Sequence, residues 1–194
     1  MNGCLRLLVF SLSLAAACAH PPAPPRLAPG QAIAVLPPNN RTGNPLFVSG
    51  ASFLDRYVFH AEVVTVGDVL AGEARFQLAE RGFRVIPGQV IAAATKGQTP
   101  ESPAAAAEIA SRGKLDALAL YLEMRQWEPD GSIETTFVIV GLSLSLVDPA
   151  TGNVVWRLDR RPAPVATPGE VTLESAYGTA ARKVIAEVLQ PFGQ

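Results

Sequence analysis

One stretch of the chain opens on a two-residue repeat and continues through a turn into a second apolar run. It runs Leu142-Ser143-Leu144-Ser145-Leu146-Val147-Asp148-Pro149-Ala150-Thr151-Gly152-Asn153-Val154-Val155-Trp156-Arg157-Leu158. Leucines alternate with serines at its start, as in a strand with one buried face. Residues 148–153 have the composition of a turn. We therefore expect an antiparallel hairpin within residues 135 to 158, with Trp156 on its core face.

Further strands are predicted before the hairpin. Large aliphatic side chains occupy every second position from Leu118 to Arg125, and short apolar runs cover residues 32–36 and 83–87. Three segments remain outside these strands: 39–45 and 128–131, expected as turns, and 46–64, which fits either a helix or an irregular covering segment.

Helices are predicted from their caps and from apolar spacing. Thr65 and Asp68 match a capping box, and Thr167 and Glu170 match a second one after a proline-rich loop. Three helices are expected over residues 66 to about 81, 103 to about 112, and 168 to about 189, and residues 88–95 are a candidate for a further short helix. The order β-α-β-α-β-β-β-α predicts a mixed sheet with helices packed against it, in one α/β or α+β domain over residues 31–194.

The N-terminal residues have the layout of a secretory signal peptide. Arg6 precedes a short apolar run, and three alanines then lead to Cys18. Leu14-Ala15-Ala16-Ala17-Cys18 resembles the lipobox of bacterial lipoproteins, which implies removal of residues 1–17 and acylation of Cys18. The alternative is an ordinary cleavage site after Ala17 or Ala19. Residues 18–30 are rich in proline and predict an extended spacer.

Composition and residue types exclude several functions. The net charge is −1 and no basic run exists, so we expect no nucleic-acid partner. Loss of Cys4 with the signal peptide and acylation of Cys18 would leave no thiol for catalysis or metal binding. The histidines are His20, in the spacer, and His60, beside Phe59 and without a Gly-x-Ser-x-Gly motif.

Other candidate sites are equally incomplete. Arg112-Gly113-Lys114 lacks the hydroxyl residue that completes a phosphate-binding loop. A carboxylate-pair glycosidase would have to draw on Asp55, Glu62 and Asp68, and nothing marks a pair among them. Three aromatic residues could line a ligand groove, although strand aromatics usually pack in the core: Tyr121, Trp127 and Trp156. We therefore predict no catalytic, cofactor-binding or metal-binding residue.

Several motifs in order resemble a family of bacterial envelope lipoproteins that includes a surface-antigen candidate. They are Ile33 to Asn40, Gly82 to Pro87, Asp116 to Leu122 and Leu146 to Trp156. This arrangement is similar more broadly to the sheet-and-helix domain of the curli-secretion lipoprotein CsgG, the penicillin-binding-protein activator LpoB, the polysaccharide-export lipoprotein PelC and the N-terminal domain of TolB. In CsgG long hairpins insert into the membrane. Residues 133–147 are the candidate here, and their alternation equally fits a half-buried soluble strand.

The resemblance implies a non-catalytic lipoprotein that binds envelope proteins or itself. It would serve as an adaptor or subunit of a secretion, polysaccharide-export or cell-wall-synthesis assembly. Ala19 replaces the aspartate typical of inner-membrane retention, so we expect the periplasmic face of the outer membrane. The alternative is an envelope hydrolase or small-ligand-binding lipoprotein, which a deep pocket with two facing carboxylates would favour.

Overall fold

The structure is a computed structural model that describes residues 27–28, 30–49, 63–131 and 135–193. Its main sheet has the strand order β5-β1-β6-β7-β8, and β2 also pairs with β6. The strands are β1 Ala32–Val35, β2 Asn39–Asn40, β5 Arg84–Val85, β6 Leu118–Pro129, β7 Phe137–Val147 and β8 Val154–Ala166. β1 is parallel to β5 and β6, whereas β6, β7 and β8 form an antiparallel meander. The predicted mixed sheet is confirmed.

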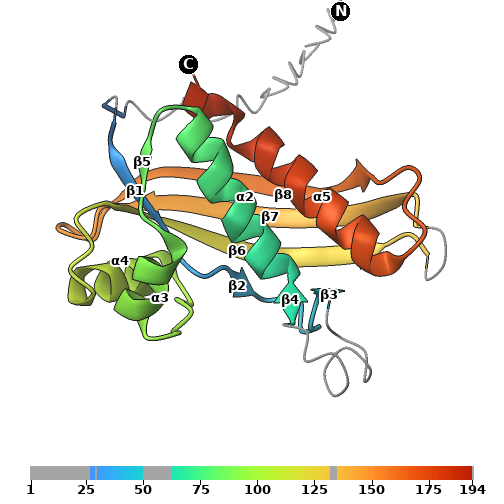
Figure 1. The fold of residues 1–194 in the computed structure, drawn as a ribbon, viewed down its shortest axis with the longest axis horizontal. Helices are drawn as coiled ribbons and strands as arrows, with labels where there is room; N and C mark the ends of the chain where they lie inside the picture. The colour runs from blue at the N-terminus through green and yellow to red at the C-terminus, as the bar shows by residue number, and fades with distance from the viewer. Residues whose placement is uncertain (1–26, 29, 50–62, 132–134, 194) are drawn as a thin grey trace, which may run out of the picture.

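Two helices cover one face of this sheet. α2 (Val66–Glu80) and α5 (Leu173–Val188) lie side by side across it (Figure 1). Beneath them lies the main core, where Leu122, Leu144 and Trp156 come from the three meander strands. The alternate residues of these strands point to the opposite face, as the two-residue strand repeat requires.

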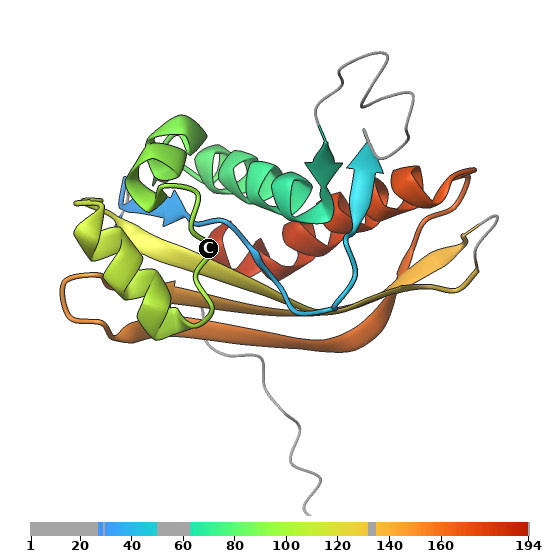
Figure 2. The same cartoon turned by 90° about the horizontal axis from the view of Figure 1, so that it is seen from below.

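The opposite face is covered at one end only within the described chain. α3 (Gly88–Thr95) and α4 (Pro103–Arg112) are in contact with each other, and α4 packs on β6 and β7. A second apolar cluster forms there, with Ala106 and Ala110 of α4 against Ala119 and Tyr121 of β6. Figure 2 shows the long meander strands continuing beyond these helices with no helix on that side.

The helix caps explain where the helices begin. Thr65 and Asp68 form the predicted capping box, with the Thr65 amide 2.8 Å from the Asp68 carboxylate. Ser102 caps α4 and Pro103 follows at its first position. The helices predicted at residues 66, 88 and 103 are thus confirmed, each within a residue or two of its expected end.

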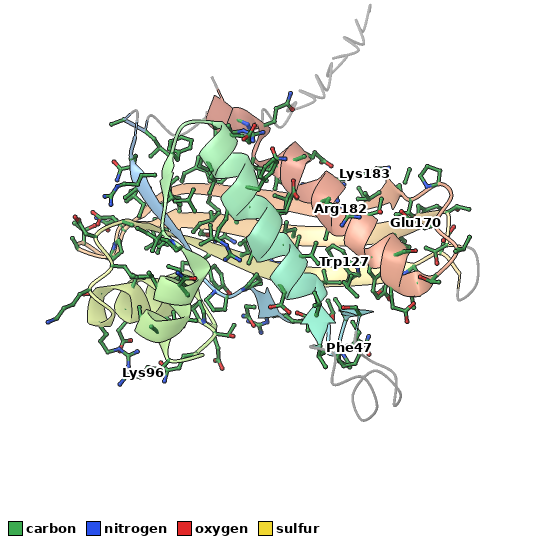
Figure 3. The ribbon with its side chains drawn as sticks, viewed as in Figure 1. Phe47, Lys96, Trp127, Glu170, Arg182 and Lys183 are labelled. Atoms are coloured by element: carbon green, nitrogen blue, oxygen red, sulfur yellow. The ribbon has the colours of Figure 1, made fainter. Side chains whose placement is uncertain are left out.

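The second predicted capping box is wrong. The Thr167 hydroxyl is buried and donates to the Thr135 carbonyl, and Gly169 has a φ of +81°, which is outside the helical region. Glu170 instead accepts from the Thr179 hydroxyl, on the side of α5 that carries Lys183 (Figure 3). The N-cap of α5 lies five residues after the predicted one, at Thr172, whose hydroxyl accepts from the Ser175 amide.

The proline-rich loop predicted after residue 158 is also wrong, because β8 continues to Ala166. Pro162 and Pro164 fit this strand since β8 lies at the edge of the sheet, where one side of the strand needs no backbone donor. Two smaller differences concern the region before α2. Asn39–Asn40 pair with β6 rather than forming only a loop, and β3 (Phe47–Ser49) pairs with β4 (Val64–Thr65). Residues 50–62, and with them most of the uncertain segment, lie outside the described residues.

The expected placement of Trp156 in the core is confirmed. Its side chain is 6% exposed, pairs with Leu146 across the strands and meets Phe192 edge-to-face with ring centroids 4.8 Å apart. Phe192 belongs to the short C-terminal 3-10 helix Gln190–Gly193, so this contact holds the end of the chain against the sheet.

We predict that Trp156→Ala lowers the free energy of unfolding by about 3–5 kcal/mol, because it opens a cavity in the core. For a chain of this length the melting temperature should fall by roughly 6–20 °C. Val155→Ala is the matched control, since Val155 is 48% exposed on the other side of the same strand. Thermal unfolding of both variants tests this, and equal melting temperatures would contradict the core placement.

Candidate functional site

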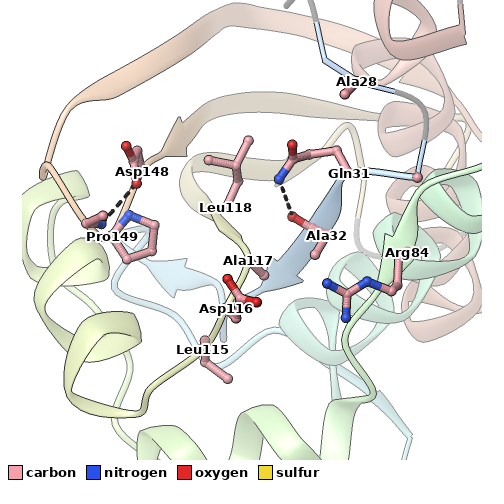
Figure 4. Close-up of a pocket in the computed structure, with 12 residues that line it drawn as sticks. Ala28, Gln31, Ala32, Arg84, Leu115, Asp116, Ala117, Leu118, Asp148 and Pro149 are labelled. Carbon is pink, nitrogen blue, oxygen red and sulfur yellow. Dashed lines mark hydrogen bonds between the residues drawn. The ribbon is translucent and has the colours of Figure 1, made fainter.

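A hollow lies where β1 and β6 begin (Figure 4). Its volume is about 430 Å³, and its charged lining residues are Arg84, Asp116 and Asp148. Both oxygens of Asp148 are engaged within the β7–β8 turn, by the Ala150 amide at 2.9 Å and the Thr151 hydroxyl at 2.9 Å. Asp148 therefore stabilises the turn.

A more extensive site is the uncovered side of the meander, which we call the open face. Register and alternation place its members opposite the core residues: Glu123, Arg125, Gln126 and Glu128 of β6, Phe137, Ile139, Gly141 and Ser143 of β7, and Arg157, Asp159, Pro162, Pro164 and Ala166 of β8. The face divides into a charged part near α4 and an apolar part toward the β6–β7 turn.

Charged side chains in the first part form a continuous network across the strands. Arg125 bonds the Glu123 carboxylate at 2.7 Å and reaches Asp159 of β8 at 3.1 Å. Arg157 forms an ion pair with the same aspartate, at 2.9 Å. Tyr121 extends the network, since its hydroxyl donates to Glu123 at 2.8 Å and accepts from the Asn39 side chain at 3.1 Å.

Local backbone geometry explains how Arg125 spans two strands. The pairing of β6 with β7 shifts register between Met124 and Gln126, so Arg125 sits at a bulge that re-aims its side chain. Only small residues stand below it on β7. Ser143 lies in register between Glu123 and Asp159, and a Cβ on Gly141 would come within 3.1 Å of Pro162.

The network sets the ionisation of its carboxylates. Hydrogen bonds from Arg157 lower the pKa of Asp159. Burial opposes ionisation of Glu123, but hydrogen bonds from Arg125 and Tyr121 outweigh it, so the pKa of Glu123 also lies below its usual value. Burial raises the pKa of Tyr121, which keeps its proton available for Glu123. Neither carboxylate is held protonated, so neither has the raised pKa of a general acid.

The residues singled out in the sequence do not assemble into a site. Tyr121 and Trp127 are 1% and 2% exposed, and Trp127 meets Tyr177 of α5 edge-to-face (Figure 3). Together with the burial of Trp156, this excludes an aromatic groove made of these three residues. Asp68 serves the cap of α2, and Lys114 belongs to the turn after α4. Cys18, Asp55, His60 and Glu62 lie outside the described residues.

The described residues contain neither a cluster of metal ligands nor a membrane-spanning helix. No group of three or more His, Cys, Asp and Glu side chains is placed to hold a metal ion there. Over the same residues, no helix is long and apolar enough to cross a membrane.

Comparison with known proteins identifies the fold. Neither a family model nor a curated protein sequence matches the chain. Among solved structures, the PelC dodecamer from Paraburkholderia phytofirmans matches with a TM-score of 0.52 and 21% identity, over 88% of this chain and 93% of that chain. The chain therefore has the fold of PelC, which confirms one of the expected likenesses.

Two other solved structures are similar at lower TM-scores. Lipoprotein GNA1162 from Neisseria meningitidis matches at 0.46, with 16% identity, over 82% of this chain and 96% of that chain. The LpoB C-terminal domain from Salmonella enterica matches at 0.44, with 18% identity, over 73% and 87%. The expected likeness to CsgG and TolB stays a prediction.

The network leads to a prediction about pH. Because the pKa values of Glu123 and Asp159 are lowered in the folded protein, both groups stabilise it above about pH 4, and this contribution is lost as the pH falls through the lowered values. Arg125→Met should therefore reduce the free energy of unfolding by up to about 1 kcal/mol at pH 7, as expected for partly exposed pairs, and by less at pH 3.

Urea unfolding at both pH values measures this difference. Arg112→Met is the matched control, because Arg112 pairs with exposed Glu108 on α4, at 3.6 Å. It should change little at either pH. An equal loss for Arg125→Met at pH 7 and pH 3 would show that the arginine acts through packing and not through charge.

Proposed function

We propose that this chain is a non-catalytic bacterial envelope lipoprotein, anchored through lipid on Cys18, that works by associating with copies of itself and with other envelope proteins. The fold shared with a protein crystallised as a dodecamer carries the proposal. The N-terminal resemblance to a lipobox supports the anchor. The assembly served would be one of secretion, polysaccharide export or cell-wall synthesis.

The side chains of the described surface support a binding role over a chemical one. Glu123, Arg125, Arg157 and Asp159 of the open face are paired with one another, and the Asp148 carboxylate in the pocket where β1 and β6 begin is occupied by its own turn. Catalysis needs a group whose pKa or position prepares it to transfer a proton or attack a substrate. The described residues supply surface for contact instead.

The length of the spacer limits where the domain works. Leu27 packs against the main core, so the folded part begins nine residues after Cys18 (27 minus 18). An extended chain of that length spans about 30 Å. A lipid on Cys18 would therefore keep this end of the domain within about 30 Å of the membrane, with the outer membrane and its periplasmic face as the proposed location.

Lipidation has a direct test. Radiolabelled palmitate should enter the wild-type protein and not Cys18→Ser, because an acyl chain of this kind requires the cysteine. Density-gradient fractionation should place the wild type with the outer membrane. Incorporation of label into both proteins, or residence of the wild type with the inner membrane only, would refute the corresponding part of the proposal.

Self-association has a separate test. The full-length protein, extracted from membranes in mild detergent, should have a mass of several chains by light scattering after correction for detergent. A homo-oligomer should dissociate on dilution, since its equilibrium depends on protomer concentration. A mass of one chain at all concentrations would overturn the proposed self-association.

A further inference from the structure

We propose that the open face is the surface through which copies of this chain contact one another; this rests on the proposed self-association. The face is the largest part of the sheet that the described helices leave bare, because α2 and α5 occupy the other side and α4 reaches only the end near Tyr121. Figure 2 shows this bare side along the meander.

The apolar part of the face has the composition of an interface centre. Ile139 lies in register between Glu128 and Pro164, and Phe137 pairs with Ala166. The side chains of Phe137 and Ile139 are half-buried, whereas Pro162, Pro164 and Ala166 are exposed. Protein interfaces commonly place such apolar residues at the centre and charged residues at the rim. The Glu123–Arg125–Asp159–Arg157 network borders this apolar part on the side toward α4.

The charges of the face favour a second copy as the occupant. Their signs alternate along the sheet, from Arg157 to the acidic pair Glu123 and Asp159, then Arg125, then Glu128. A uniformly charged partner, such as nucleic acid or an anionic lipid surface, would meet repulsion at every second position. Another copy of the same face carries both signs, so each charge has an opposite counterpart within reach.

The outer edge of the sheet is less suited to this contact. β8 is the edge strand, and a copy that added a strand there would need a regular row of backbone donors and acceptors. Pro162 and Pro164 have no N–H, which removes donors from that edge. Arg160, beside them, is held inward by Glu187 at 2.9 Å and by the Val140 carbonyl. β8 is therefore better suited to contact a second copy through the open face than through its outer edge.

Two substitutions on the face test the proposal in the full-length, detergent-extracted protein. Ile139→Lys places a charge in the apolar part, and Pro164→Lys does so at an exposed position of the edge strand, where the fold tolerates most side chains. We expect both to lower the mass from light scattering below that of the wild type, because the contacts made through this face are lost. Circular dichroism and thermal unfolding should show that each variant remains folded.

Phe76→Lys is the matched control. Phe76 is a large apolar side chain, 56% exposed on α2, and so belongs to the helical layer on the other side of the sheet. It should leave the oligomer intact. If the wild type is oligomeric and the oligomer persists in both Ile139→Lys and Pro164→Lys, or is lost only in Phe76→Lys, the proposed surface is wrong while self-association stands. A wild type that is monomeric throughout would instead overturn self-association itself.

Discussion

The burial of one face of the β6–β7–β8 meander beneath α2 and α5 is the constraint on which the rest of the structure depends. Leu122, Leu144 and Trp156 belong to the same apolar layer, although they come from three strands. A fully buried aliphatic side chain contributes roughly 1.5–3 kcal/mol, so a row of them outweighs most local preferences. A register slip of one residue would turn this row to the open face, which is why the meander has a single pairing over most of its length.

The same constraint shapes the open face, because a strand residue that points into the core is followed by one that points outward. Those neighbours must tolerate water along most of the sheet, and the chain meets this requirement with a paired network of charges. Arg125 can cross to Asp159 only because a bulge re-aims it and Ser143 is small. Ser143 lies in register between Glu123 and Asp159 of this network and is 3% exposed.

The two sides of the sheet therefore have different roles. The helical side supplies stability, and its contacts extend from the capping box at Thr65 to the C-terminal Phe192. The open face supplies chemistry that is suited to contact with another protein: apolar side chains, alternating charges and an edge strand interrupted by prolines. A lipid anchor nine residues before Leu27 would hold both sides close to a membrane without requiring the domain to enter it.

Elements whose signals are local could be predicted from the amino-acid sequence. Period-two alternation predicted β6 and β7, the Thr65–Asp68 pair predicted the start of α2, and the same alternation placed Trp156 in the core. These features depend on residues within one turn of helix or one strand, so the pattern contains the necessary information.

Tertiary structure decided what depends on distant partners. Thr167 has the local pattern of a cap, but its hydroxyl is bound by the Thr135 carbonyl, 32 residues earlier. β8 passes through two prolines because it is an edge strand, and edge position is a property of the whole sheet. Likewise, the contact of Arg125 with Asp159 requires a bulge and an intervening strand with a small side chain. No single stretch of the sequence contains all of these conditions, because the residues come within bonding distance only when the chain folds.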